Sequence, residues 1–430
     1  MLDAKVFTNF KRIDKNGEHK LDGFKRDEKR TIKDNFIIKG NNLLALASLK
    51  KEFAGKVKLI YIDPPYNTGN DGFKYNDSFN HSSWLTFMKN RLDIAKQLLR
   101  DDGVIFVQCD YRENSYLRIL MDQIFGRDNL VNEITWRKYG GVKNQATKKL
   151  TTQQETILLY SKSSVYNLNF LYNTLSEKYV SDEYKYTDKD GRIYAKLRGR
   201  GYQGGSKETK VKYLDENQGS PITSLWSEDG LQLNTSSSEK IGDFIGQKPE
   251  ALLKRIIDIA SKQGDLVLDF FAGTGTTLAV AHKTGRQYIG IEQMDYIHDL
   301  PESRLKKVIA GEQGGISKAV NWQGGGEFVY MELARWNEKW MEKIRDAKTE
   351  EELIGICNEL KENTFLSWRI DPKKVDTKAK DFTDLSIADK KKFLIEMLDK
   401  NQLYVNLSEI EDKEYGVSEE DKKLNKEFYE

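Results

Sequence analysis

The stretch "GDLVLDFFAGTGTTLAVAHKTGRQYIGIE", residues 264–292, decides the fold class of this 430-residue chain. A short apolar run is followed by a glycine turn, an apolar-periodic helix, a glycine stop and a second apolar run. Strands that alternate with helices in this way are typical of a parallel sheet with right-handed crossovers. We therefore predict an α/β fold built on a parallel sheet.

The glycine turn in this stretch is a candidate cofactor site. Gly273 and Gly275 follow the strand and open the helix at about Thr276, so a ligand can approach bare backbone and the positive end of a helix. Glu292 ends the next strand, where an acid can hold the two hydroxyls of a ribose. Leu278 replaces the third glycine of the dinucleotide fingerprint, which leaves an adenosine site or an ordinary strand-to-helix turn.

A second α/β unit lies earlier in the chain. We predict a helix over residues 41–53, a buried strand over 56–63, a helix over 83–100 and a strand that ends at Asp110. The two units can be assembled into one sheet, with the middle of the chain inserted between them. Ligands of open parallel sheets bind beyond the carboxyl ends of the strands, which is where Asp63 falls.

The turn after the first of these strands is a candidate catalytic site, formed by Asp63, Pro64, Pro65 and Tyr66. Proline has a fixed φ and no N–H, so its carbonyl stays available as an acceptor in a rigid turn. A carboxylate beside such a carbonyl suits an amino group, and Tyr66 offers a face to the planar ring that carries it. A plain strand-terminating turn would explain one proline only.

Basic residues concentrate in the middle of the chain, although 69 basic and 67 acidic residues give a net charge of only +2. Residues 192–212 hold seven Lys or Arg and one acid among glycines and tyrosines. Arginine can pair with phosphates and tyrosine can stack on bases, so we predict a nucleic-acid surface. Its candidate residues are Arg192, Lys196, Arg198, Arg200, Tyr202 and Lys207.

Several functional classes are disfavoured by composition. Cys109 and Cys357 lie far apart and no histidine pair has ligand spacing, so we expect neither a disulfide framework nor a metal site. No apolar run reaches the length of a membrane span, and the polar N-terminus lacks a signal core. We expect a protein that is neither secreted nor membrane-spanning, with a cytoplasmic location.

These motifs resemble those of the DNA amino-methyltransferases. "DPPYNTG" is similar to their motif IV and "DFFAGTGTT" to their motif I, in the permuted order of the beta class; "IGQKPEALLKRII" and "QQETILLYSKS" resemble motifs X and VIII. The strings "GNNLLAL", "IFGRDNLVN" and "RLKKVIAGEQGGISKAVNWQGGGEFVYMEL" are similar to modification (Mod) subunits of type III restriction-modification systems. Relatives often carry a longer N-terminal segment and a larger recognition region.

The resemblance implies a circularly permuted Rossmann-like methyltransferase fold and transfer of a methyl group from S-adenosylmethionine to N6 of a flipped-out adenine in double-stranded DNA, with no metal. Asp63 and the Pro64 carbonyl would accept from the amino group, and Tyr66 would stack on the base. The implied cofactor residues are Asp269, Phe271, Gly273, Gly275, Glu292 and Lys248. A homodimer and a restriction (Res) subunit are the implied partners. A cytosine-N4 enzyme, a vestigial DNA-recognition protein and a nicotinamide-dependent oxidoreductase remain alternatives.

We predict five segments along the chain. Residues 1–35 form an N-terminal arm, 36–163 the catalytic half of the methyltransferase domain, and 164–241 the target-recognition domain. Residues 242–310 form the cofactor-binding half and 311–430 a mostly helical C-terminal domain, whose start at 311–326 is predicted to be a linker or extended loop.

Overall fold

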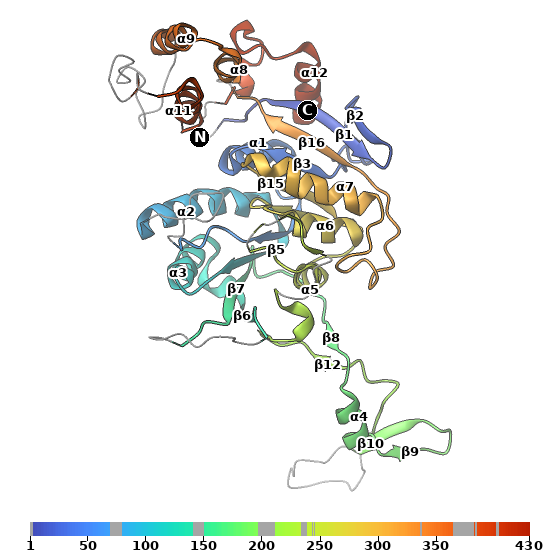
Figure 1. Ribbon diagram of the computed structural model, residues 1–430. Coiled ribbons are helices and arrows are strands. Elements are labelled where there is room, and N and C mark those ends of the chain that lie inside the picture. Colours follow the sequence, from blue (N-terminus) through green and yellow to red (C-terminus); the bar gives the residue numbers. More distant parts are fainter. Residues whose placement is uncertain are drawn as a thin grey trace.

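A single large sheet organises the protein in the computed structural model (Figure 1). The structure describes residues 3–68, 80–140, 150–196, 211–233, 239–242, 244, 246–335, 338–363, 382, 385–400 and 404–430. Within these residues eleven strands pair in the order β13-β6-β7-β5-β4-β14-β15-β3-β16-β1-β2. Their bounds are β1 Phe7–Asp14, β2 Gly17–Lys20, β3 Phe36–Lys39, β4 Val57–Ile62, β5 Leu99–Cys109, β6 Leu130–Arg137, β7 Gln154–Ser161, β13 Leu225–Trp226, β14 Leu266–Asp269, β15 Gln287–Glu292 and β16 Phe328–Leu333.

The two predicted α/β units meet at the centre of this sheet. β4 lies beside β14 in parallel, with Ile60 opposite Leu268. All residues of both strands are buried, as expected for strands covered on both faces. Because parallel neighbours end at the same edge, the turn after β4 and the turn after β14 are adjacent. The predicted α/β class and the single shared sheet are confirmed.

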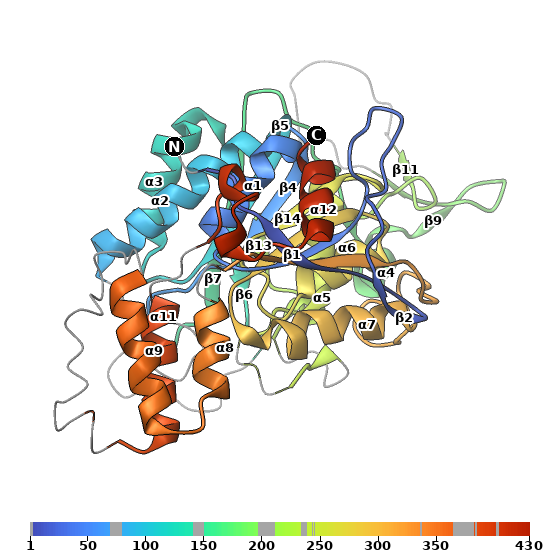
Figure 2. The same ribbon diagram turned by 90° about the horizontal axis from the view of Figure 1, so that it is seen from above.

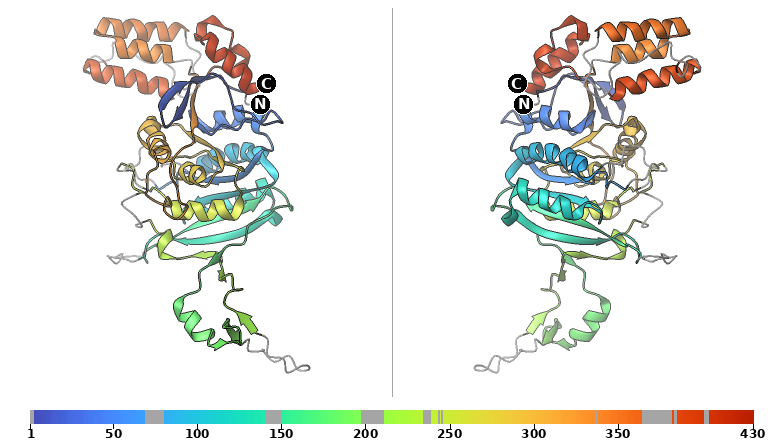
Figure 3. Two further views of the ribbon diagram at one scale, coloured as in Figure 1. Left: turned by 90° about the vertical axis from the view of Figure 1, so that its right-hand side faces the viewer. Right: turned by 90° about the vertical axis from the view of Figure 1, so that its left-hand side faces the viewer.

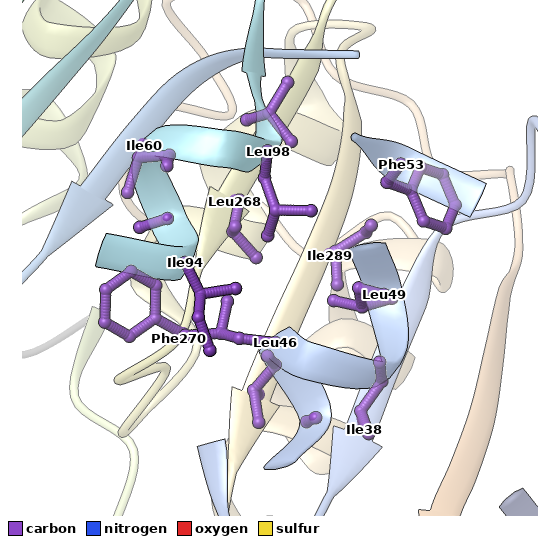
Figure 4. Packing of buried hydrophobic residues seen from close by; sticks show 14 of the residues in the cluster. Ile38, Leu46, Leu49, Phe53, Ile60, Ile94, Leu98, Leu268, Phe270 and Ile289 are labelled. Atoms are coloured by element: carbon purple, nitrogen blue, oxygen red, sulfur yellow. The ribbon is translucent and has the colours of Figure 1, made fainter. Parts of the chain in front are cut away.

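Helices cover both faces of the sheet (Figure 3). Apolar residues of α1 (Asn42–Phe53), α2 (His81–Leu98) and α3 (Asn114–Phe125) form one core with the strands. Those of α5 (Glu250–Ala260), α6 (Thr276–Lys283) and α7 (Ser303–Ile309) form the other. Figure 4 shows side chains of the first core, among them Leu46 of α1, Leu98 of α2 and Ile289 of β15. Alternate residues of each strand point to opposite cores, so both faces must be covered.

The N-terminal segment and the C-terminal helix are part of this main body. β1 pairs antiparallel with β16, and α12 (Glu419–Tyr429) packs on β1, as Figure 2 also shows. The rings of Phe7 and Phe428 lie 5.2 Å apart, and the Asn425 side chain accepts a hydrogen bond from the Phe7 amide at 2.8 Å. The segment boundaries of the sequence analysis stay a prediction, but the sheet takes strands β1 and β2 from the predicted N-terminal arm and β16 from the predicted C-terminal domain.

Residues 311–326 are irregular, as predicted, yet they are fastened to the body rather than loosely extended. The Ile316 amide donates to Glu250 at 3.0 Å, and the Trp322 indole donates to the Val308 carbonyl at 2.7 Å. Residues 328–333 then form β16, a strand that lies between β3 and β1. Its sequence FVYMEL is rich in the aromatic and β-branched residues that favour strands.

Two smaller units project from the body (Figure 1). One is joined through β8 (Tyr172–Asn173) and β12 (Ser220–Pro221), and it contains α4 (Glu177–Glu183) and a small sheet of β9 (Tyr186–Thr187), β10 (Ile193–Lys196) and β11 (Val211–Tyr213). The other packs α8 (Glu338–Asp346), α9 (Glu350–Asn363) and α11 (Ile387–Lys400) around a separate apolar cluster. Among the described helices, none is both long enough and apolar enough to cross a membrane.

Candidate active site

A cavity of about 460 Å³ lies where β4 and β14 end. All four residues of the DPPY turn line it, and so do Asp269, Phe271, Gly273, Glu292 and Lys248. Gly275 is absent from the lining and lies one residue before α6. The structure therefore brings the two predicted sites into one cavity of the size typical for small-molecule ligands.

The DPPY turn is held by two residues from other segments and by one contact within the turn. The Trp84 indole of α2 donates to the Pro65 carbonyl at 2.7 Å. Lys248, just before α5, forms an ion pair with Asp63 through its Nζ, and the Tyr66 hydroxyl contacts the other Asp63 oxygen. Burial raises the pKa of Asp63, although the Lys248 ammonium opposes the rise. The Asp63 side chain is still 24% exposed, so its carboxylate faces the cavity.

The glycine turn after β14 is shaped by a buried carboxylate. Asp269 accepts from the Phe271 amide at 3.0 Å and from the Thr277 hydroxyl at 2.6 Å, which ties the start of α6 to the strand end. Burial raises the pKa of Asp269 to about 7. Gly275 has φ +74°, and a Cβ there would lie 2.8 Å from Pro301 Cβ. Both geometries require glycine at this position.

Glu292 closes the cofactor side of the cavity. Its carboxylate accepts from the Gly273 amide at 2.9 Å and from the Gln293 and Met294 amides at 2.8 and 3.0 Å. Burial raises the pKa of Glu292 even though these amides favour its charged form. The acid is thereby fixed at the end of β15, which is separated from β4 and the DPPY turn by β14, and the open Gly273 backbone follows β14.

The two described candidates for DNA binding do not line the cavity: Lys196 ends β10 of the small projecting sheet, and Arg192 lies one residue before this strand. Arg192 is paired within that sheet, to Asp215 at 2.7 and 2.8 Å and to Glu216 at 2.6 Å. Lys196 Nζ lies 4.1 Å from the centroid of the Tyr186 ring. The other four candidates lie outside the described residues: Arg198, Arg200, Tyr202 and Lys207.

Several residues that line the cavity were not singled out from the sequence. Glu155 on β7 accepts from the Tyr66 hydroxyl at 2.9 Å, and Lys138 donates to Glu155 at 2.8 Å. Asp110 and Arg112, after β5, line the same cavity. Glu155 lies inside "QQETILLYSKS", so the resemblance to motif VIII was the signal that could have indicated it. In the described part of the chain, no cluster of His, Cys, Asp and Glu could hold a metal ion.

Comparison with known proteins agrees with this site. Residues 57–303 match the family described as DNA methylase, which covers both turns. The chain is 41% identical, over its whole length and 72% of the relative, to a probable type III restriction-modification enzyme HindVI Mod subunit of Haemophilus influenzae. It is 31% identical to the StyLTI Mod subunit of Salmonella typhimurium, over 56% of the chain and 49% of that subunit.

Among solved structures, the chain is similar to the M1.HpyAVI–SAM complex, with 18% identity and a TM-score of 0.40 over 63% of the chain and 98% of that structure. The match to the family and the full-length match to the Haemophilus influenzae subunit agree with each other. The chain thus belongs to the DNA methylase family and, within it, to the Mod subunits of type III restriction-modification systems.

Proposed function

We propose that the protein transfers a methyl group from S-adenosylmethionine to N6 of an adenine flipped out of double-stranded DNA. The observation that carries this proposal is the shared cavity: the pairing of β4 with β14 sets an amino-group acceptor beside an adenosine-type cofactor turn. Adenine is favoured over cytosine because cytosine-N4 enzymes usually begin this motif with serine, whereas position 63 is aspartate.

The residues of the cofactor side fit S-adenosylmethionine. Gly273 has no side chain, and a Cβ there would meet nothing closer than 3.8 Å, so the turn is open to a ligand. Glu292 would hold the ribose hydroxyls, and Phe271 would pack beside the methionine part. Asp269 would shape the turn rather than touch the ligand, since both its oxygens already have donors. The cofactor, when bound, supplies a methyl group on a sulfonium sulfur, which is a good leaving group.

On the substrate side, Asp63 and the Pro64 carbonyl would accept from the adenine amino group and orient its lone pair. The Pro65 carbonyl already accepts from Trp84, which leaves Pro64 as the second acceptor of the turn. Tyr66 would stack on the base. These contacts act mainly by positioning and by strengthening as the nitrogen becomes tetrahedral. Flipping the base costs a few kcal/mol, which stacking and phosphate contacts partly offset.

We assign DNA recognition to residues 164–241, which include the projecting unit, as the target-recognition domain, and the two sheet halves 36–163 and 242–310 to catalysis and cofactor binding. Lys196 is its best described candidate for a DNA contact, because Arg192 already has two carboxylate partners. A homodimer and a restriction subunit are the partners we propose, since the relatives are named as Mod subunits of restriction-modification enzymes.

Methyl transfer from labelled S-adenosylmethionine to DNA tests the proposal directly. Asp63→Ala is expected to lower the rate by at least about 100-fold, as loss of one transition-state hydrogen-bonding partner does elsewhere. Tyr66→Ala should weaken methylation while cofactor binding survives. Asp101→Ala, at the amino end of β5 with 92% of its side chain exposed, is the matched control. DNA binding without any methyl transfer by the wild-type protein would support a vestigial recognition protein.

Thermal stabilisation separates the remaining enzymatic alternative. S-adenosylhomocysteine should raise the melting temperature of the protein, because a ligand that binds only the folded state stabilises it by mass action. NAD should leave it unchanged. Stabilisation by NAD alone would favour a nicotinamide-dependent oxidoreductase.

A further inference from the structure

One hydroxyl group in the cavity faces two carboxylates. The Tyr66 hydroxyl contacts Asp63 Oδ1 and also lies 2.9 Å from Glu155 Oε2. A phenol carries a single proton, so it can donate to only one of these acceptors at a time. The hydrogen bond therefore has two alternative positions within the same arrangement of side chains.

Both oxygens of Asp63 have donors in this structure. Oδ1 is contacted by the Tyr66 hydroxyl, and Oδ2 is paired with the Lys248 ammonium. A carboxylate oxygen has two lone pairs, so Asp63 Oδ1 can accept a further hydrogen bond, but an oxygen shared between two donors bonds each of them less strongly. Asp63 Oδ1 is therefore a stronger acceptor for the target amino group when the Tyr66 hydroxyl no longer donates to it.

Glu155 is held in place as the alternative acceptor. Gln108 Nε2 donates to Glu155 Oε2 at 2.6 Å, and the Gln108 oxygen accepts from the Tyr61 hydroxyl at 2.8 Å. Lys138 holds the other oxygen of Glu155 at 2.8 Å. The sheet order β4-β5-β7 sets Tyr61, Gln108 and Glu155 on neighbouring strands, so this chain of hydrogen bonds is anchored in the rigid sheet.

Nearby ammonium groups keep Glu155 ionised, which is the form that accepts hydrogen bonds. Burial raises the pKa of Glu155, but the ammonium groups of Lys248 and Lys138 outweigh it, so the net pKa lies below its ordinary value. Asp63 has the opposite balance, with burial prevailing over Lys248. Glu155 thus stays a carboxylate, which accepts a hydrogen bond more strongly than a neutral group does.

We propose that Glu155 is a positioning residue that takes the Tyr66 hydroxyl hydrogen bond when the target amino group enters, and so frees Asp63 Oδ1 to accept from it. The inference rests on the proposed methyltransferase function. The exchange needs no movement of the Tyr66 ring, because its hydroxyl oxygen lies within hydrogen-bond distance of both acceptors and only the O–H bond turns.

A double-mutant cycle tests this role. Glu155→Gln keeps the size but weakens the acceptor, so the Tyr66 hydroxyl stays on Asp63. We expect the single-turnover methylation rate, at saturating DNA and cofactor, to fall by at least about tenfold, the effect of about 1.4 kcal/mol. In the Tyr66→Phe background, which has no hydroxyl to relocate, Glu155→Gln should cost less than about threefold. Cofactor affinity, measured by calorimetry, should not change.

The possible results separate a failure of this inference from a failure of the proposed function. An equal loss in both backgrounds, or no loss in the presence of the hydroxyl, overturns the inference while the wild-type enzyme stays active. Absence of methylation by the wild-type protein overturns the proposed function instead. If the Glu155→Gln variant does not fold, Lys138→Met replaces it in the same cycle, because this substitution removes the ammonium that holds Glu155. Lys138→Met must also lower the methylation rate more when Tyr66 is present than in the Tyr66→Phe background.

Discussion

Asp269→Asn should make the stability of the protein less dependent on pH. Asp269 is only 2% exposed and lies behind the glycine turn, where its two acceptor contacts come from Phe271 and Thr277. Burial raises the pKa of this carboxyl from 3.8 to about 7. Asparagine has nearly the same shape and cannot ionise, so the substitution removes the titration and keeps the position polar.

The raised pKa means that the folded state binds the Asp269 proton more tightly than the unfolded state does. The protonated Asp269 therefore contributes to the free energy of unfolding at low pH, and this contribution is lost as pH rises from about 4 to about 7. At 1.36 kcal/mol for each pH unit, the rise from 3.8 to about 7 corresponds to about 4 kcal/mol in total. Between pH 5 and pH 8 the loss is about 2 to 3 kcal/mol.

Urea denaturation without cofactor, at pH 5, 6, 7 and 8, measures the effect. We expect the free energy of unfolding of Asp269→Asn, relative to wild type, to improve by about 2 to 3 kcal/mol from pH 5 to pH 8. Asp101→Asn, at an exposed position, should show no such trend. A difference between Asp269→Asn and wild type that stays constant over this range would refute the reasoning, because Asp269 would then titrate alike in both states.

Two further substitutions test packing around the site by the same denaturation assay. Gly275→Ala should lower the free energy of unfolding by about 1–3 kcal/mol more than Gly264→Ala does. Both positions have positive φ (+74° and +80°), but only at Gly275 would a Cβ meet Pro301. Equal losses would contradict the crowding at Gly275. Glu250→Gln should cost about 3–5 kcal/mol, because it leaves the fully buried Lys283 with a weaker partner; a loss below about 1 kcal/mol would show that Glu312 alone neutralises Lys283.

The local pattern of residues was sufficient for the two central α/β units. The predicted helix at 41–53 is α1 over Asn42–Phe53, and the predicted strand end at Glu292 is the end of β15. Periodicity, an asparagine cap and glycine turns act over a few neighbouring residues, so one chain displays them without a structure. The same holds for the DPPY and glycine turns, whose residue types already indicate the chemistry they can perform.

Contacts between distant segments could not be derived in this way. β1 pairs with β16 across more than 300 residues of chain, and neither strand was singled out from the sequence. Strand pairing depends on which partner is available in three dimensions, and that outweighs weak local preference. The tertiary structure alone decided that the N-terminal strands join the sheet through β16 and that the C-terminal helix packs on β1.

The features of the active site can also be separated into those set by local sequence and those set by tertiary contacts. The sequence by itself determined that a carboxylate, two prolines and an aromatic follow β4, and that a glycine turn with a distal acid follows β14. Only the tertiary structure decided that Lys248 pairs with Asp63 and that Glu155 contacts the Tyr66 hydroxyl beside it. These residues come from different elements and meet only when the strands assemble. A short stretch of sequence shows which chemical groups are present. The pKa and the hydrogen-bond partners of a buried group depend on every element packed around it.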